Sequence, residues 1–190
     1  MIIPKDQFYI DKVLVGDSSA FAVLVDRHKN IVFNICVKIL GNREEAEEVA
    51  QDAFLKAYEK LGTFRKEAKF SSWLFRIAYN MSISQQRKSK VKNLYLDDYT
   101  IETYSEDELI ETLNQESVEE REKKLKSAIG KLVPEQQLLL ELFYDKEMSI
   151  IDVAKITDLS ESNVKVKIHR ARKKLFNLIQ ISPNSIAKRA

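Results

Sequence analysis

The sequence predicts an all-α protein with two small helical domains: an N-terminal helical bundle and a C-terminal helix-turn-helix joined by an acidic linker. The 190 residues include only 4 Gly and 3 Pro, whereas a sheet protein needs many tight turns. Apolar residues recur at helical spacing, and capping residues stand at the ends of the periodic segments. We expect the boundaries to fall at 1–91 for the first domain, 92–116 for the linker, 117–182 for the second domain and 183–190 for a tail.

The N-terminal domain is expected to begin with three helices. A short first helix precedes a longer one that Ser18 or Ser19 caps and that ends at Gly41. Asn42 then caps a third helix over residues 44–61, whose first turns are rich in glutamate and therefore suit the positive end of the helix dipole.

A fourth helix is expected from about 71 to 90, after a loop at 62–69 without a helical period. At 100° per residue, its core face would carry Phe70, Trp73, Leu74, Ile77 and Met81. The other side would carry Arg76, Tyr79, Asn80, Ile83 and Arg87. These mostly polar residues are not needed for a core, so the second face is a candidate binding surface.

The C-terminal domain ends in a helix-turn-helix pattern. A capping box opens the domain at Ser117, and Ser149 begins a short helix that runs to Thr157. A tight turn at 158–160 then leads into a long basic helix that runs to Ile179. This succession is typical of proteins that place the second helix in the DNA major groove.

The outer face of that long helix has the chemistry of a DNA-reading surface. Short side chains near the start of a recognition helix reach base edges, and cations along its flanks hold phosphates. The candidate residues are Ser160, Ser162, Asn163, Lys165, Val166, Lys167, His169, Arg170 and Lys173. The alternative is a surface helix whose charges are only solvated; the turn and the one-sided basic face favour DNA binding.

Aromatic and basic residues also interleave around the loop at 62–69. The net charge is only +2, but basic residues concentrate in 66–92 and 165–174 while 97–122 is acidic. Single-stranded DNA is bound by rings that stack on bases and by cations that hold the backbone. In the loop the candidates are Phe64, Arg65, Lys66 and Lys69. Phe70 and Trp73 are expected to pack in the core, so Phe64, Tyr79 and Asn80 are the better functional candidates.

Residues 18–91 resemble the promoter-melting domain of bacterial sigma factors, and residues 118–179 resemble their helix-turn-helix domain. The small size is similar to that of the extracytoplasmic-function (ECF) subfamily of the sigma-70 family. The segments that carry the resemblance are EAEEVAQDAFLKAY at 45–58, TFR at 63–65, FSSWLFRIAYN at 70–80, LVPE at 132–135 and VKVKIHRARKKL at 164–175. No single motif suffices, but their order and spacing make the match specific.

The resemblance implies a role for each surface. Glu48, Gln51 and Asp52 would dock on the clamp helices of the large subunit of core RNA polymerase. The loop would capture a base flipped from the minus-ten element, beside the DNA-facing fourth helix, and the C-terminal helix would read the minus-thirty-five element as duplex. The linker would thread the polymerase cleft or act as a solvated tether. An anti-sigma factor is a further implied partner.

Two departures prevent the promoter sequence from being carried over. Ser84 stands where many relatives have Asp, and Val166 is an unusual apolar residue on a DNA-facing surface, although it could touch a thymine methyl group.

Two other function classes fit the sequence less well. A stand-alone helix-turn-helix regulator would explain the C-terminal half but would leave the aromatic-basic loop and Gln51–Asp52 unused. An enzyme such as a nuclease is disfavoured because no metal-ligand cluster, phosphate-binding glycine loop or nucleophile set stands out. We therefore expect no catalysis, cofactor or metal.

The sequence also predicts the protein's compartment and the surroundings of two single residues. The lone Cys36 should be a buried apolar side chain, and His28 should pack at the margin of the core. The N-terminus lacks a signal-peptide pattern and no apolar run approaches the length of a membrane span, so a cytoplasmic protein without membrane insertion is expected.

Overall fold

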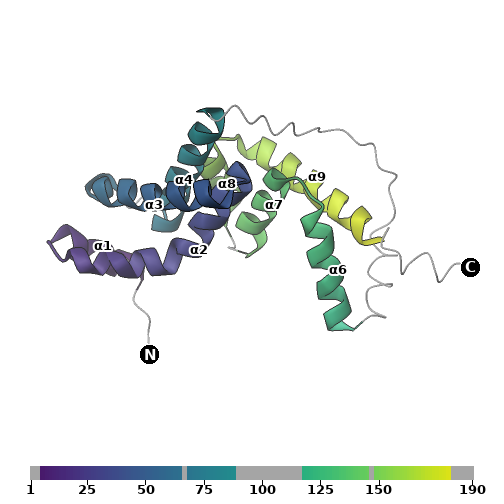
Figure 1. Cartoon of the computed structure of the whole chain (residues 1–190), viewed down its shortest axis with the longest axis horizontal. Helices are drawn as coiled ribbons and strands as arrows, with labels where there is room; N and C mark the ends of the chain where they lie inside the picture. The colour runs from purple at the N-terminus through teal and green to yellow at the C-terminus, as the bar shows by residue number, and fades with distance from the viewer. Residues whose placement is uncertain (1–4, 66–67, 89–116, 146–147, 181–190) are drawn as a thin grey trace, which may run out of the picture. The chain divides into compact units, whose positions relative to one another are not determined.

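The computed structural model describes residues 5–65, 68–88, 117–145 and 148–180, and every regular element in these ranges is helical (Figure 1). The prediction of an all-α fold is confirmed. The helices form two compact units, the first with α1 to α4 and α8, the second with α6, α7, η3 and α9. The expected linker and tail lie outside the described residues, and the domain boundaries stay predictions. No described helix is long and apolar enough to cross a membrane.

The first unit opens with α1 (Asp6–Leu14), the 3₁₀ turn η1 (Ser18–Ala20) and α2 (Phe21–Leu40). The predicted cap of α2 is wrong: its N-cap is Ala20, without a side-chain hydrogen bond, because both serines belong to η1. The predicted end is confirmed. Gly41 adopts a left-handed conformation with φ 71°, which glycine accepts without steric cost.

Helix α3 (Arg43–Glu59) begins as predicted. The Asn42 side chain accepts hydrogen bonds from the backbone N–H groups of Glu44 and Glu45 at 2.8 and 3.1 Å. The helix ends slightly before the predicted Leu61 because the chain tightens into the 3₁₀ turn η2 (Leu61–Thr63). Leu61 is only 2% exposed, so this turn is fixed by packing.

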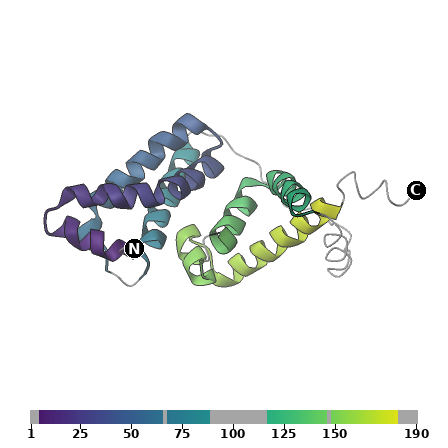
Figure 2. The same cartoon turned by 90° about the horizontal axis from the view of Figure 1, so that it is seen from below.

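Helices α2, α3 and α4 (Phe70–Lys88) pack against one another and form the core of the first unit (Figures 1 and 2). Alanines at fully buried positions of α3 and α4 let the backbones approach closely. Gln86 of α4 also donates to the carbonyl of Ile39 in the last turn of α2, at 2.6 Å. Cys36 is buried in this core, as predicted, and burial raises the pKa of its thiol.

The core face of α4 is only partly as predicted. Phe70 and Leu74 are buried, but Trp73, Ile77 and Met81 are half-buried. The remaining buried side chains of the helix are Ser72, Phe75, Ala78 and Ser82. Ser82 tolerates burial because its hydroxyl donates to the carbonyl of Ala78 at 2.8 Å. The buried stripe is therefore rotated around the helix relative to the predicted one, toward small residues that fit between neighbouring helices.

The second unit contains α6 (Val118–Gly130), α7 (Pro134–Leu140), the π-helical turn η3 (Glu141–Asp145) and α9 (Glu161–Gln180). The capping box predicted at Ser117 is present, with Glu120 as its partner. Lys167 of α9 forms an ion pair at 3.1 Å with Glu135 in the first turn of α7. This contact joins the two helices.

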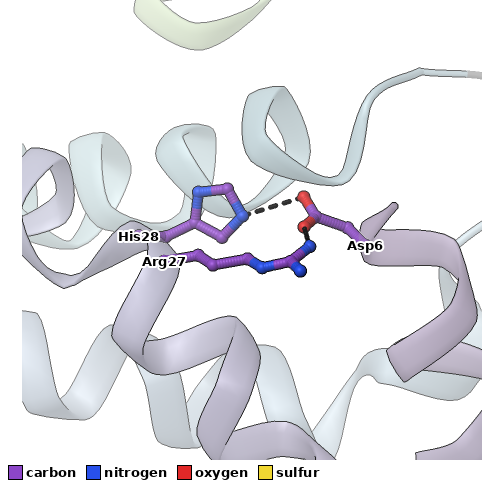
Figure 3. Close-up of polar contacts among 3 residues, drawn as sticks. All are labelled: Asp6, Arg27 and His28. Carbon is purple, nitrogen blue, oxygen red and sulfur yellow. Dashed lines mark hydrogen bonds and ion pairs between the residues drawn. The ribbon is translucent and has the colours of Figure 1, made fainter. Parts of the chain in front are cut away.

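An ionic cluster fastens α1 to α2 (Figure 3). Asp6, in the first turn of α1, accepts hydrogen bonds from Arg27 at 2.9 Å and from His28 Nε2 at 2.8 Å. The hydrogen bond from His28, and then that from Arg27, hold the pKa of Asp6 below its usual value against the opposing effect of burial. The guanidinium of Arg27 also lies 4.7 Å from the centre of the Tyr9 ring. Asp6 therefore stabilises the packing of the first helix.

This geometry predicts an acid-dependent contribution to stability. Because the pKa of Asp6 is lowered in the folded state, its contribution is present above the unfolded pKa of 3.8 and is lost as pH falls through the folded value. Asp6→Asn should reduce the free energy of unfolding by about 1 kcal/mol at neutral pH. Urea unfolding at a series of pH values should show this difference shrinking between about pH 5 and pH 3. A difference that does not change over that interval would contradict the role of the carboxylate.

Candidate nucleic-acid interface

Phe64, Phe70 and Trp73 form an aromatic cluster around the start of α4. The Phe64 ring centre lies 5.8 Å from that of Phe70 and 5.4 Å from that of Trp73, and Phe70 and Trp73 are 5.8 Å apart. The predicted core position is confirmed for Phe70, whereas Trp73 lies at the margin of the core, and Phe64 joins the two rings. Phe70 is buried, whereas Phe64 and Trp73 are half-buried and keep ring surface accessible. The cluster is thus a preformed support on which a base could stack.

Cationic side chains flank this aromatic cluster. Arg65, which follows Phe64 in the chain, and Lys69, which precedes Phe70, are both exposed. Lys66 lies outside the described residues. Rings with accessible faces beside exposed cations are the combination that single-stranded nucleic acid requires.

The outer face of α4 continues from the cluster along the helix. Arg76, Asn80 and Arg87 are exposed, and Tyr79 and Ile83 are half-buried. At 100° per residue all five fall on one side of α4, so the predicted grouping on one face is present. An open pocket is lined by Tyr79, Asn80, Ile83, Ser84 and Arg87 together with Thr157 and Asp158.

Helix α8 (Ile150–Thr157) provides the last two of these pocket residues, because it packs against α4 within the first unit. Arg76 forms an ion pair at 3.6 Å with Asp158, between side chains that are 51% and 80% exposed. The sequence did not predict this contact. No periodic pattern reveals it, because each partner only looks like a solvated charge in its own segment.

The turn after α8 is built as the sequence predicts. The Ser149 hydroxyl accepts a hydrogen bond from the backbone N–H of Asp152 at 3.1 Å and caps the start of the helix. Asp158 ends it with φ 58°, a left-handed conformation that Asp adopts more readily than most residues. The chain then passes through Leu159 and Ser160 into α9.

Helix α9 has one buried stripe and one broad exposed face. Val164, Ile168 and Ala171 are buried, with at most 5% exposure. The exposed candidates are Ser160, Ser162, Asn163, Lys165, Val166, His169, Arg170 and Lys173. Lys167 differs because its ammonium is paired with Glu135 and its side chain is 25% exposed. Contact with a phosphate would have to compete with this pair, so Lys167 is the weakest member of the set.

A separate acidic face lies on α3. Glu48, Gln51 and Asp52 are all exposed, while Val49 and Ala53 face the core. Leu55, one turn further on, is 62% exposed and was not predicted as part of this surface. The sequence could have indicated Leu55, because it stands at helical spacing from the exposed acidic residues Glu48 and Asp52. An exposed apolar residue beside acids is suited to a protein partner.

Comparison with known proteins identifies the family. The family model described as "Sigma-70 region 2" matches residues 24–91, and the one described as "Sigma-70, region 4" matches residues 122–175. The ECF RNA polymerase sigma factor SigW of Bacillus subtilis is 36% identical over 173 residues, which cover 87% of this chain and 92% of SigW. The chain belongs to the ECF subfamily of sigma-70 factors. Such a factor directs RNA polymerase to promoters.

A second relative supports the family, and a solved structure supports the fold. The ECF sigma-E factor of Haemophilus influenzae is 30% identical over 183 residues, covering 92% of this chain and 95% of the relative. The solved structure of the sigma factor RpoE with the anti-sigma factor NepR from Bartonella quintana has a TM-score of 0.58 and 21% identity. That alignment covers 85% of this chain and 98% of the solved one, and it shows a shared fold.

The two family regions map onto the surfaces of this sigma factor. Region 2 spans most of α2 together with α3, η2 and α4, and so includes the acidic face, the aromatic cluster and the outer face of α4. Region 4 spans most of α6, then α7, α8 and the greater part of α9. Sigma factors are transcription initiation factors rather than enzymes. Among the described residues, no group of His, Cys, Asp and Glu is arranged to hold a metal ion.

Proposed function

We propose that this sigma factor grips two promoter elements in different ways and accelerates no covalent step itself. In this proposal α9 holds the minus-thirty-five element as duplex, and the aromatic cluster with the outer face of α4 captures the minus-ten element as a single strand. The observation that carries the proposal is the contrast between the two surfaces. One combines accessible rings with cations, whereas the other is a polar and basic helix face.

Strand capture at the first surface follows from the physics of base flipping. Taking a base out of the duplex costs a few kcal/mol, which stacking and phosphate contacts must offset. Stacking on Phe64 or Trp73 supplies about 1–3 kcal/mol per base, and Arg65 and Lys69 hold the backbone nearby. Asn80 is exposed and lines the open pocket on the outer face of α4, where it can hydrogen-bond the edge of an extruded base.

Duplex recognition at the second surface uses the start of α9. Ser162, Asn163 and Lys165 are exposed in its first turns, where a recognition helix meets base edges. Val166 is 48% exposed among them and would contact a thymine methyl group. Arg170 and Lys173 lie further along and hold phosphates.

The proposed partners are core polymerase and an anti-sigma factor. The acidic face of Glu48, Gln51 and Asp52, with Leu55 beside it, would dock on the clamp helices of the large polymerase subunit. An anti-sigma factor is proposed because the related RpoE from Bartonella quintana was solved with the anti-sigma factor NepR. The chain acts in the cytoplasm, where core polymerase works, and the polymerase supplies the catalytic centre.

Permanganate footprinting tests strand capture directly, with the holoenzyme bound to a promoter from which it initiates transcription. The proposal expects reactive thymines in the minus-ten element only when both core polymerase and this protein are present. Reactivity that core polymerase produces alone would remove the basis for strand capture.

Lys173 provides a test of the duplex contact. Lys173→Ala should weaken binding to all promoter sequences alike and lower the slope of log affinity against log salt concentration by about one unit, because one phosphate contact is lost. Lys126→Ala on α6 is a matched control, since Lys126 is 80% exposed but lies outside the proposed interface. An unchanged slope for Lys173→Ala would place Lys173 off the DNA backbone.

A further inference from the structure

The ionic cluster of Asp6, Arg27 and His28 is connected to the aromatic cluster by ring contacts. The centre of the His28 ring lies 5.7 Å from that of Phe70 and 5.8 Å from that of Phe75. Phe70 in turn contacts both Phe64 and Trp73. A continuous set of contacts therefore runs from the first turn of α1, through α2, to the rings of the aromatic cluster.

The hydrogen bond to Asp6 restricts the orientation of the His28 ring. The carboxylate can only accept, so His28 Nε2 carries the proton that it donates at 2.8 Å. The other carboxylate oxygen is held by Arg27, which keeps the acceptor in place (Figure 3). The His28 side chain is only 13% exposed, and its ring contacts the Asp6 carboxylate as well as the buried rings of Phe70 and Phe75.

We propose that His28 is a positioning residue: held by Asp6, its ring fixes Phe70 and thereby the arrangement of Phe64 and Trp73 that receives a base of the opened strand. The inference rests on the proposed capture of that base. It makes α1 a functional element, because the acceptor that orients His28 comes from its first turn. The alternative is that Asp6 and His28 only stabilise the fold and have no effect on the loop.

Trp73 makes the arrangement measurable without DNA. It is the one tryptophan of the 190-residue chain, so fluorescence excited at wavelengths that the seven tyrosines do not absorb reports on the aromatic cluster alone. Asp6→Asn removes the charged acceptor, and His28→Gln keeps an amide donor for Asp6 but removes the ring. Asp26→Asn is the matched control, because Asp26 forms an exposed ion pair with Lys29 on α2.

The experiment compares the full-length variants well below their unfolding temperatures. Trp73 emission is recorded first, and promoter opening by the holoenzyme is then followed with 2-aminopurine in the minus-ten element. Asp6→Asn and His28→Gln should both shift the emission and slow opening by about three- to tenfold, at unchanged affinity for core polymerase. Asp6→Glu should recover most of both signals, and Asp26→Asn should match the wild type.

Three results would overturn the inference. The first is unchanged Trp73 emission in both variants, because the contact would then not hold the cluster. The second is a shifted emission with wild-type opening. The third is slow opening in Asp6→Asn but not in His28→Gln, which would assign the effect to α1 alone. A wild-type holoenzyme that opens the promoter by permanganate reactivity but gives no 2-aminopurine signal would instead refute base capture, while the emission data would still test the contact.

Discussion

Asp52→Lys is expected to lower the affinity of the sigma factor for core polymerase by about ten- to a hundredfold, roughly 1.4–2.8 kcal/mol, because it reverses the charge at the proposed docking face. Asp52 is exposed at the centre of the acidic face, between Glu48 and Leu55. Reversing its charge leaves the core of the first unit untouched, so the helix should still fold. Equilibrium binding of fluorescently labelled protein to purified core polymerase measures the effect.

Asp26→Lys is the control for that experiment. Asp26 is also an exposed aspartate in the first unit, with a side chain that is 75% exposed, but it lies on α2 outside the proposed docking face. The control should bind polymerase as the wild type does. Equal affinities for Asp52→Lys and wild type would remove α3 from the docking surface.

Asn80→Ala is expected to weaken promoter opening by about 1–3 kcal/mol at one base position, which corresponds to roughly 5- to 150-fold in the opening equilibrium. The side chain is exposed beside the α4 pocket, so the substitution removes hydrogen-bonding groups without creating a cavity in the core. Duplex binding at the minus-thirty-five element should be unchanged, because that contact is assigned to α9. Permanganate footprinting at each thymine of the minus-ten element locates the defect.

The matched control is Asn30→Ala, the same substitution at an exposed position of α2 outside the proposed interface. It should leave opening unaltered. A uniform loss across all base positions for Asn80→Ala would contradict a base-specific role and would indicate a phosphate contact instead.

The sequence predicted the helix boundaries well where they depend on a few neighbouring residues. Gly41, Asn42, Ser117 and Ser149 each act through a local backbone conformation or a hydrogen bond within one turn. Ser18 and Ser19 look equally suitable as caps but lie in a 3₁₀ turn. Their side chains resemble those of the true capping residues, so the sequence alone does not distinguish a cap from a residue in a 3₁₀ turn. Tertiary packing determines which one forms.

The candidate site was predicted less completely, because its details depend on contacts between distant segments. The outer face of α4 was identified correctly, since helical spacing fixes which residues share a side. The buried side of α4 differs from the predicted one because it depends on where α2 and α3 pack, and the spacing of apolar residues within α4 does not reveal this. The Lys167–Glu135 and Arg76–Asp158 pairs could not be predicted for the same reason.

The contrast between a sigma factor and a stand-alone regulator is also physical. A regulator binds duplex operators alone, often as a dimer on inverted half-sites, and leaves the strands paired. It has no use for accessible rings beside exposed cations in a second domain. Gel-shift assays with and without core polymerase separate the two: tight, specific binding by the isolated protein to inverted repeats would favour the regulator.

Run-off transcription with purified core polymerase on a library of genomic fragments tests the two-element mechanism most directly. Addition of the protein should create new transcription starts preceded by two shared sequence elements, and changes in the upstream element should weaken binding while changes in the downstream one impair opening. Starts identical to those of core polymerase alone, or new starts that depend on a single element, would contradict it.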